Sequence, residues 1–241
     1  MIGPAFFLIV MTVWYFASYY FPPYLLPPPQ DVLKVLWEDK DLLVGHTTHT
    51  LITASIGLFL SFILGLGMMI ISYFIPKIQG VFLRVLEIFQ MIPSAVLFPL
   101  FIAWFGLNIV PKLIMVILVC GFPLTQLLLN SLQESLHKYS FIKVFSVSTF
   151  NEFLWVHLPY SIPRALEGIQ LGISYAFMMV ILGEFMGSEK GMGVYIIRAQ
   201  SAYRMDRLIG VTLLGILITY SALLSIRCLH RFFFYRHHSI E

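Results

Sequence analysis

The sequence predicts an all-α membrane protein with about six transmembrane helices. Its composition is the first reason, because 59% of the residues are hydrophobic and only 11% are charged. Soluble domains are roughly 45–50% apolar and about 25% charged, so a chain with so few charges cannot form a soluble surface. The second reason is a series of apolar stretches, each as long as the ~20 residues that a helix needs to cross a bilayer.

The first apolar stretch, residues 2–21, predicts a transmembrane helix rather than a signal peptide. No basic residue precedes it, it is too long for the apolar core of a signal peptide, and no Ala-x-Ala cleavage site follows. Tyrosines crowd its end, as in the aromatic belt at a membrane surface. Beyond a run of prolines, Asp31–Trp37 predicts a short amphipathic helix.

The second predicted span covers residues 42–74. Small and hydroxylated residues recur along it every three or four positions, at Thr50, Thr53, Gly57, Ser61 and Gly65. Such a face lets membrane helices approach closely. His46 and His49 lie one helical turn apart at its start, a spacing that also suits a metal or haem pair. Since no third ligand is apparent, we predict structural roles at the membrane surface and no metal site.

The third predicted span, residues 81–105, contains Pro93 and Pro99. Each proline frees backbone groups that inside a bilayer must be satisfied by protein or at a water-lined cavity. Broken helices of this kind border transport paths, although a packing kink gives the same pattern. The remaining predicted spans are 109–132, 165–187 and 208–234.

Residues 134–160 form the longest polar break in the chain and separate the fourth and fifth predicted spans. This 134–160 loop is a candidate docking place for another protein. We expect residues from about 135 to 153 to form a short helix, with basic and apolar side chains directed at the partner. Pro159 and Pro163 then begin the fifth span, because proline is tolerated in the first turn of a helix. The alternative is a helix that only lies at the membrane surface.

Six spans place both termini on the same side of the membrane. The basic residues divide almost equally between the two sides, but the positive-inside rule gives most weight to short loops and helix ends. Lys77 and Arg84 in one turn, and the cluster from Arg227 to Arg236, favour termini in the cytoplasm. The 134–160 loop is then cytoplasmic too.

The fifth predicted span carries a polar face. Steps of three or four residues lead along one side of the helix through Gln170, Ser174, Phe177, Ile181 and Glu184. An amide, a hydroxyl and a carboxylate on one face do not suit contact with lipid. Glu184 therefore lines a path or binds another helix, and both alternatives stay open.

Known catalytic motifs are missing from the sequence. It has no His-Glu-x-x-His, no Gly-x-Ser-x-Gly, no paired aspartates within spans and no glycine-rich phosphate loop. We therefore predict no catalytic residue and no ATP hydrolysis by this chain. Cys120 and Cys228 suit neither a disulfide framework nor a metal site, and the net charge of +3 is too small to indicate nucleic-acid binding. A transport subunit powered by another protein fits best; the alternative is a non-transporting membrane scaffold or an anchor for an enzyme.

Five motifs carry a resemblance to a known family. They are Leu26–Leu33, His46–Gly57, Pro93–Gly106, Leu158–Pro159 with Pro163 and Gly168, and Glu184 with Gly191–Gly193. In this order and spacing they resemble the permease subunits of binding-protein-dependent ABC importers. The closest match within that family is the group for nitrate, aliphatic sulfonates, taurine and pyrimidine vitamin precursors. The resemblance covers nearly the whole chain from Leu25 onward.

Two departures from the family pattern bear on the site. The family's Glu-Ala-Ala run falls here on residues 140–142, which are Ser-Phe-Ile, and its glycine falls on Ser146. Basic residues that the family often carries in the second and fifth spans are replaced by Thr53 and Gln170. Because charges at membrane depth are costly and usually functional, fewer buried cations disfavour an anionic solute.

The resemblance implies a single permease domain over residues 1–241, with the type I ABC importer fold, in the bacterial inner membrane. It implies a coupling helix between the fourth and fifth spans that docks a separate ATPase. That ATPase would bind the ATP and Mg²⁺, so this chain itself would hold no cofactor. The other implied partners are the lipid bilayer, an extracytoplasmic substrate-binding protein and a second permease copy in a homodimer.

Two sets of candidate site residues complete this hypothesis. The residues expected to contact the ATPase are Lys138, Phe141, Lys143, Phe145, Ser146 and Pro159. The residues expected along the translocation path are Pro93, Pro99, Gln170, Ser174 and Glu184.

Overall fold

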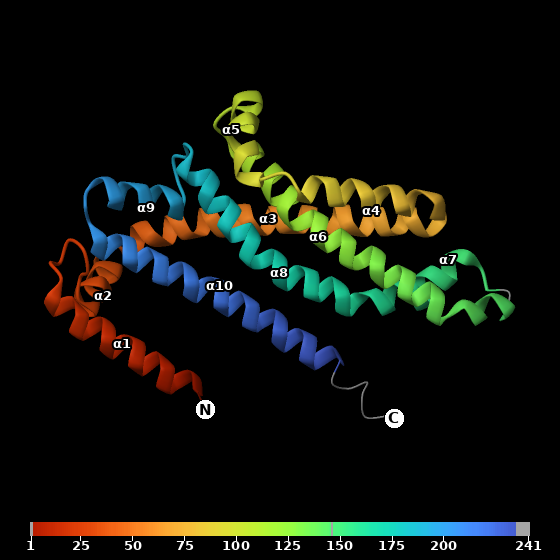
Figure 1. Cartoon of the computed structure of the whole chain (residues 1–241), viewed down its shortest axis with the longest axis horizontal. Coiled ribbons are helices and arrows are strands. Elements are labelled where there is room, and N and C mark those ends of the chain that lie inside the picture. Colours follow the sequence, from red (N-terminus) through yellow and green to blue (C-terminus); the bar gives the residue numbers. More distant parts are fainter. Residues whose placement is uncertain (1, 146, 235–241) are drawn as a thin grey trace. The chain divides into compact units, whose positions relative to one another are not determined.

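The computed structural model describes residues 2–145 and 147–234, which are mostly helical and contain no strand (Figure 1). The α-helices are α1 (Ile2–Tyr20), α2 (Pro29–Glu38), α3 (Lys40–Phe74), α4 (Pro76–Gln90), α5 (Ser94–Phe105), α6 (Ile109–Lys138), α7 (Thr149–Glu152), α8 (Leu158–Phe185), α9 (Met192–Ser201) and α10 (Met205–Phe234). A 3-10 helix (Ser140–Phe145) precedes α7, and a π-helix (Phe153–His157) follows it.

Four of the described helical stretches are long and apolar enough to cross a membrane. They are Lys40–Phe74, Ile109–Lys138, Thr149–Phe185 and Met205–Cys228. Two shorter apolar stretches are Leu8–Tyr20 and Val96–Phe105. The all-α membrane class that the composition predicted is therefore confirmed.

The predicted third span, 81–105, is divided into two helices. α4 ends at Gln90 and α5 begins at Ser94, with Pro93 as its N-cap at φ −61° and ψ 102°. A proline has no amide hydrogen and disfavours the helical conformation of the residue before it, so the helix stops there. Pro99 lies within α5 and does not end it.

The 134–160 loop is not the single short helix expected from 135 to 153. α6 continues to Lys138, and the 3-10 helix, α7 and the π-helix then follow in turn. The run before α7 consists largely of β-branched, aromatic and serine residues, which have low helix propensity. Ser148 starts α7 as its N-cap, since its hydroxyl accepts a hydrogen bond from the amide of Asn151.

Two helices also extend past the predicted span limits. α6 runs to Lys138 rather than 132, because its last residues are polar but good helix formers. α8 begins at Leu158 rather than 165, which places Pro159 in its first turn, where a missing amide costs no hydrogen bond. Hydropathy had marked the apolar parts of these helices and not their ends.

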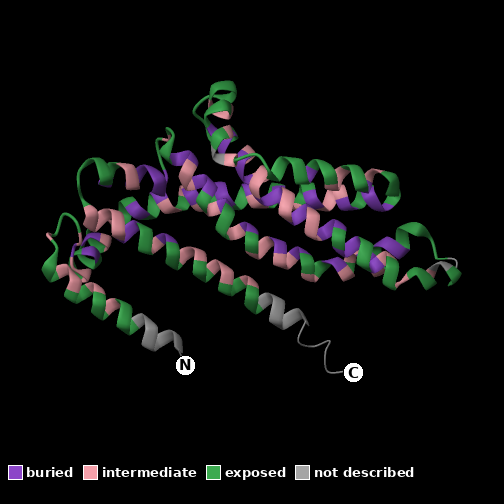
Figure 2. Cartoon of the chain, viewed as in Figure 1, coloured by how far each residue is buried: buried purple, intermediate pink, exposed green. Residues whose placement is uncertain are grey.

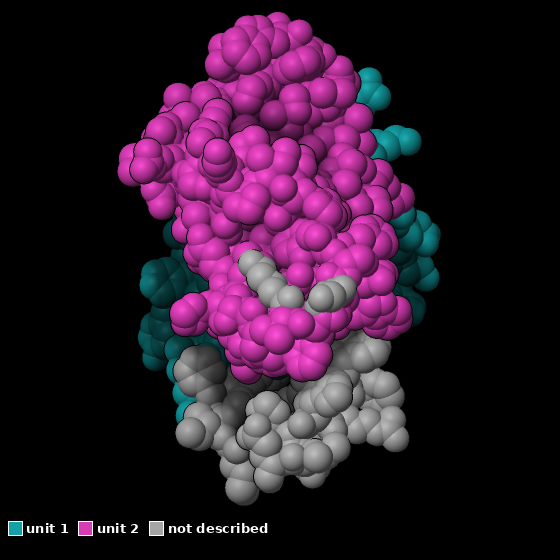
Figure 3. Space-filling model, turned by 90° about the vertical axis from the view of Figure 1, so that its right-hand side faces the viewer, with its two compact units in different colours: residues 1–51, 181–220 teal, residues 52–180, 221–241 magenta. Residues whose placement is uncertain are grey.

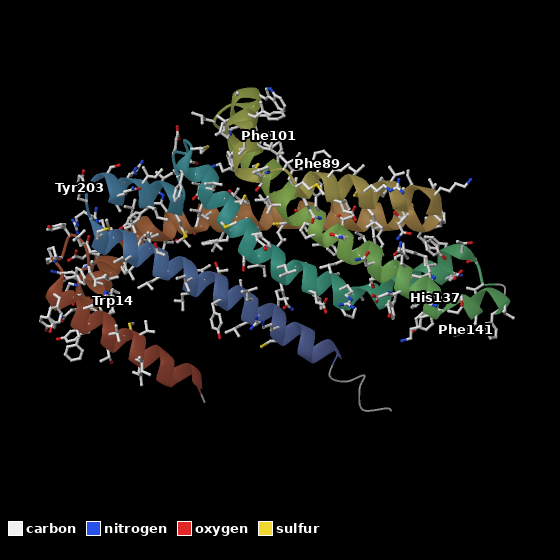
Figure 4. All side chains as sticks on the ribbon, viewed as in Figure 1. Trp14, Phe89, Phe101, His137, Phe141 and Tyr203 are labelled. Atoms are coloured by element: carbon white, nitrogen blue, oxygen red, sulfur yellow. The ribbon has the colours of Figure 1, made fainter. Side chains whose placement is uncertain are left out.

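The chain divides into two compact units, coloured separately in Figure 3. The first comprises the described parts of residues 1–51 and 181–220, and the second those of 52–180 and 221–241. In the first unit α2 buries Val32 and Val35, as predicted for an amphipathic helix. Trp14 of α1 (Figure 4) donates a hydrogen bond to the carbonyl of Pro27 at 3.1 Å.

The second unit has an apolar core made by α3, α4, α6, α8 and the π-helix. α6 is prominent in it, and many of its residues are buried (Figure 2). The core comprises Met69, Tyr73, Leu86, Leu124, Leu128, Leu129, Leu132, Phe153 and Ala165. This core holds both ends of the 134–160 loop, because α6 enters the loop and α8 leaves it.

The small face predicted along α3 packs closely against α6 in the second unit. Thr53 and Ser61 are buried, and the hydroxyl of Ser61 donates to the carbonyl of Gly57 at 2.8 Å. A Cβ atom on Gly57 would lie 2.6 Å from Cγ1 of Val116 on α6. Position 57 therefore needs glycine for the two helices to approach.

Gly57→Leu should destabilise the second unit. The new side chain must enter space that Val116 fills, and overpacking of this kind costs about 2 kcal/mol. Gly67→Leu on the same helix is the control, since a Cβ there meets nothing within 4 Å. Thermal unfolding of purified protein in detergent should give a lower melting temperature for Gly57→Leu alone. Equal melting temperatures in the two variants would argue against close packing of α3 on α6.

Candidate functional site

The 134–160 loop exposes many of its apolar side chains. The residues of this exposed apolar surface are Phe141, Val144, Phe145, Val147, Phe150, Leu154 and Trp155. Phe145, for example, is 71% exposed. Figure 4 labels Phe141 and His137 at this end of the second unit. A cluster of large apolar residues on the surface of a loop is typical of a protein interaction site.

The same loop holds a buried polar network made by Ser135, Glu152 and His157. The Nδ1 atom of His157 is 2.8 Å from Oγ of Ser135, and its Nε2 atom is 3.3 Å from Oε1 of Glu152. Ser135 and His157 are fully buried, and Glu152 is 7% exposed. The hydroxyl of Ser135 also donates to the carbonyl of Leu132 at 2.9 Å, so the three buried side chains belong to one connected hydrogen-bond network. Sequence reasoning missed this network, for which a histidine just before a Leu-Pro pair was the only local signal.

Tyr73 joins the network to α3. Its ring centroid lies 5.2 Å from that of His157 and 5.0 Å from that of Phe153. Its hydroxyl donates a hydrogen bond to the carbonyl of Thr149 at 3.1 Å. The loop is thus tied to α3 as well as to α6 and α8.

The other residues predicted to contact an ATPase belong to the same loop. Nζ of Lys138 lies 5.7 Å from the ring centroid of Tyr139 and 5.6 Å from that of Tyr160, within cation–π range. Pro159 is exposed in the first turn of α8. Outside the described residues lie Ser146 and the side chain of Lys143.

In the first unit, Glu184 is buried near the end of α8, with 1% of its surface exposed. Its carboxylate accepts from the hydroxyl of Thr50, at 2.8 Å from Oε1 and 3.0 Å from Oε2. It also accepts from the amide of Gly193 at 2.8 Å. Nδ1 of His49 lies 3.5 Å from Oε1. One carboxylate therefore links α3, α8 and α9.

The backbone amides at the start of α9 have their hydrogen-bond acceptors at this site. The amide of Met192 donates to the hydroxyl of Thr50, and that of Gly191 donates to Nδ1 of His46, both at 2.9 Å. The first amides of a helix have no partner within the helix, and a negative charge is favourable beside them. Gly191 has φ +128°, and a Cβ atom there would overlap the carboxylate of Glu184. The position therefore requires glycine.

A second polar cluster in the first unit joins α9, α10 and the α2–α3 junction. Asp39 accepts a hydrogen bond from the hydroxyl of Tyr195 at 2.6 Å and pairs with Arg207 at 3.0 Å. Burial, followed by the bond to Asp39, raises the pKa of Tyr195, so this hydroxyl stays protonated and donates. The cluster is structural, since its contacts are among residues of the fold itself.

The residues predicted along a translocation path lie on α5 and α8. Pro93 caps α5 and Pro99 lies within it, and both are exposed. Gln170 is half-buried and Ser174 exposed on the part of α8 in the second unit. The sequence left open whether Glu184 lines a path or binds another helix, and the contacts described above are of the second kind.

The sequence is similar to those of known transport proteins. Residues 57–236 match the family described as "Binding-protein-dependent transport system inner membrane component". A "Probable ABC transporter permease protein" of Haemophilus influenzae is 31% identical over 93% of this chain and 93% of its own length. The formylaminopyrimidine transport permease protein of Halalkalibacterium halodurans is 28% identical over 79% and 77%. The taurine transport system permease protein of Escherichia coli is 24% identical over 92% and 85%.

The described residues include four helices of membrane-spanning length, and together with the family match they define a multi-pass membrane permease. The chain belongs to the family of inner membrane components of binding-protein-dependent transport systems. It is the transmembrane permease component of such an ABC import system, works with a binding protein and an ATPase, and is not itself the ATPase. The resemblance predicted from the five sequence motifs is confirmed.

Proposed function

We propose that the separate ATPase binds at the 134–160 loop, and that its movement reaches the membrane helices through the Ser135–Glu152–His157 network. One observation supports this most strongly: a single loop carries both an exposed apolar surface and a buried polar network. The apolar surface supplies contact area for the partner. The network fixes the loop to its helices, because satisfied buried hydrogen bonds hold one arrangement.

The proposed contacts with the ATPase centre on Phe141 and Phe145. Large exposed aromatic side chains fit pockets on a partner and supply most of the energy of such interfaces. The remaining proposed contacts are Lys138, Lys143, Ser146 and Pro159. In this arrangement the ATPase binds ATP and Mg²⁺, and its conformational change moves the 134–160 loop of this chain.

We also propose six spans, formed by α1, α3, the α4–α5 pair, α6, α8 and α10. α4 and α5 have 15 and 12 residues, so they reach the length of a span only together. Both termini would then be cytoplasmic, on the same side as Lys77 and Arg84 of α4, as the positive-inside rule favours. A second copy of the chain would complete a homodimer that receives its solute from an extracytoplasmic binding protein.

The translocation path is proposed along α5 and α8. Its candidate residues are Pro93, Pro99, Gln170, Ser174 and Glu184. Of these, Glu184 would act by holding the start of α9 to α8 and α3, because its carboxylate is already occupied by hydrogen bonds there. The others would face the solute more directly.

His157→Ala should lower solute uptake by roughly ten-fold without releasing the ATPase. The variant leaves the buried carboxylate of Glu152 without the imidazole, a loss of about 1–3 kcal/mol, while Ser135 keeps its hydrogen bond to the carbonyl of Leu132. The exposed apolar surface is unchanged, so co-purification of the ATPase should persist. Tyr220→Ala is the control, since this exposed residue of α10 lies outside both the network and the 134–160 loop in the sequence. Normal uptake by His157→Ala would show that the network does not transmit the movement of the ATPase.

Reconstitution tests the proposed function as a whole. The permease is placed in vesicles with its ATPase and supplied with the binding protein, and ATP hydrolysis is measured together with uptake. We expect the loaded binding protein to stimulate hydrolysis and solute to accumulate inside the vesicles. A rate of ATP hydrolysis that does not change when the permease and the binding protein are added would favour a membrane scaffold instead.

A further inference from the structure

We propose that a pocket between α2, α3 and α10 binds one anionic phospholipid, with an acyl chain in the pocket, the glycerol ester at Thr47 and the phosphate at Lys40. The pocket lies within the first unit and has a volume of about 290 Å³. A cavity of about 150 Å³ binds one benzene ring, so this pocket takes a segment of a single acyl chain. Such a site does not depend on the proposed docking of the ATPase, because the residues described around it all lie outside the 134–160 loop.

Most of the described lining of the pocket is apolar. α2, α3 and α10 each supply aliphatic side chains to it, namely Leu36, Leu43, Val44 and Leu214. α2 packs closely on α10 here, since a Cβ atom on Gly210 would lie 3.2 Å from Cγ of Leu36. Val44 is 65% exposed, so the pocket opens to the surface of the unit. Because α3 and α10 both have membrane-spanning length, an acyl chain can enter between them and make van der Waals contacts with this lining.

The depths of Thr47 and Lys40 in the bilayer suit the parts of a phospholipid. α3 has 35 residues, and about 20 residues of a helix cross the hydrocarbon core. With α3 centred in the bilayer these are roughly residues 47–67, so Thr47 lies at the boundary between the hydrocarbon and the headgroups, where glycerol esters lie. Lys40 lies about 10 Å further out along the helix, which is the side of the phosphates.

Thr47 has an unused hydroxyl group. Its Oγ1 atom is buried and has no hydrogen-bond partner among the residues that the structure describes. The hydroxyl of Thr48, which also lines the pocket, instead donates to the carbonyl of Val44 at 2.7 Å. Threonine in a helix adopts either of two χ1 rotamers, so the hydroxyl of Thr47 can turn into the pocket. There it would donate to an ester carbonyl, and this bond removes the cost of a buried polar group without a partner.

Lys40 supplies the one charge of the described lining. Its Nζ atom lies 4.6 Å from the ring centroid of Trp37, and tryptophan is typical of the membrane surface. Glu38 and Asp39, just before it, each pair with another basic residue, and Asp41 is exposed and outside the lining. A lysine at the membrane surface attracts anionic lipids. A zwitterionic lipid is favoured less, because the described lining holds no carboxylate for its ammonium group.

Lipid retention tests the class of ligand. The complete permease–ATPase complex is reconstituted in vesicles of phosphatidylglycerol and phosphatidylethanolamine in equal amounts, solubilised again and measured by native mass spectrometry. We expect one phosphatidylglycerol to stay bound to each permease chain in preference to phosphatidylethanolamine, because the pocket offers a cation and no carboxylate. Equal retention of the two lipids overturns the anionic class.

Two variants test the polar contacts separately. Lys40→Gln and Thr47→Val should each lower the retention of phosphatidylglycerol roughly five-fold, since one removes a charge at the phosphate and the other a hydrogen bond to the ester. The matched controls are Lys77→Gln, an exposed lysine of the second unit, and Thr48→Val, whose hydroxyl already has a partner. Both controls should retain the lipid. Unchanged retention by Thr47→Val overturns the placement of the ester.

Filling the pocket tests the place of the acyl chain. Val44→Trp puts a large ring in the pocket and should displace the lipid, whereas Ile216→Trp, at an exposed apolar position of α10 outside the lining, should not. An unchanged melting temperature shows that each variant keeps its fold. If Lys40→Gln and Val44→Trp retain phosphatidylglycerol as well as their controls do, the lipid is held only by the general surface of the spans, and the site is overturned.

Discussion

A permease carrying Phe145→Asp should insert into the membrane and keep its fold but lose its ATPase. Phe145 is 71% exposed on the 3-10 helix, so the fold does not depend on burying its ring. In the complex, the substitution removes an aromatic anchor and forces a carboxylate into an apolar interface. Such anchors contribute about 2 kcal/mol or more, and an unpaired buried charge adds to the loss. Co-purification of the ATPase with tagged permease measures the effect, which we expect to be complete.

The matched control for this prediction is Tyr203→Asp. Tyr203 is 80% exposed in the turn between α9 and α10, away from the 134–160 loop in the sequence. It has φ +53°, a conformation that aspartate adopts more easily than most residues. The control should retain its ATPase. If Phe145→Asp retains as much ATPase as Tyr203→Asp does, Phe145 is not part of the docking surface.

The second large effect is expected from Gly191→Ala. The new methyl group would overlap the carboxylate of Glu184, and the φ of +128° is strained for any residue with a Cβ atom. Overpacking and backbone strain together cost about 4 kcal/mol. Gly45→Ala in α3 is the control, since a Cβ there meets nothing within 4 Å and alanine favours a helix. Thermal unfolding should show a large loss of stability for the first variant only.

A double variant shows whether Glu184 causes this loss. Glu184→Ala removes the carboxylate that the new methyl group would meet, although it also leaves the amide of Gly193 without its acceptor. The cost of Gly191→Ala should therefore be smaller in the Glu184→Ala background, and the two effects should not add. Additive effects would show that the strain at position 191 has another source.

Much of the fold followed from hydropathy and spacing. The apolar stretch predicted at 42–74 is α3, and the small face along it packs against α6 through Gly57. These features depend on residues close together in the sequence or repeated at helical spacing. Such features can therefore be predicted from a single sequence.

The division of the third span was only half predictable. Both Pro93 and Pro99 are visible in the sequence, yet only Pro93 ends a helix. A proline within a helix removes a backbone hydrogen bond, and the freed carbonyl can be satisfied by neighbouring groups. The sequence does not identify those neighbours. The 134–160 loop does not form the single helix that we expected, because its β-branched, aromatic and serine residues have low helix propensity.

The polar networks needed the structure. Ser135 and His157 are 22 residues apart, and Thr50 and Glu184 are 134 apart. Glu184 and Gly191–Gly193 were noted as motifs, but their contact explains why they occur together: the carboxylate fills the space that the glycines leave. Long-range hydrogen bonds of this kind leave no periodic signal in the sequence.

The most direct test of the central claim is photo-crosslinking from position 141. A photoreactive phenylalanine analogue replaces Phe141, which is 57% exposed on the 134–160 loop, in the complete transporter in vesicles. The same analogue at Tyr203 is the control. The account predicts a crosslink to the ATPase subunit from position 141 and none from position 203. An active transporter in which position 141 gives no crosslink to the ATPase would contradict the assignment of this loop as the docking site.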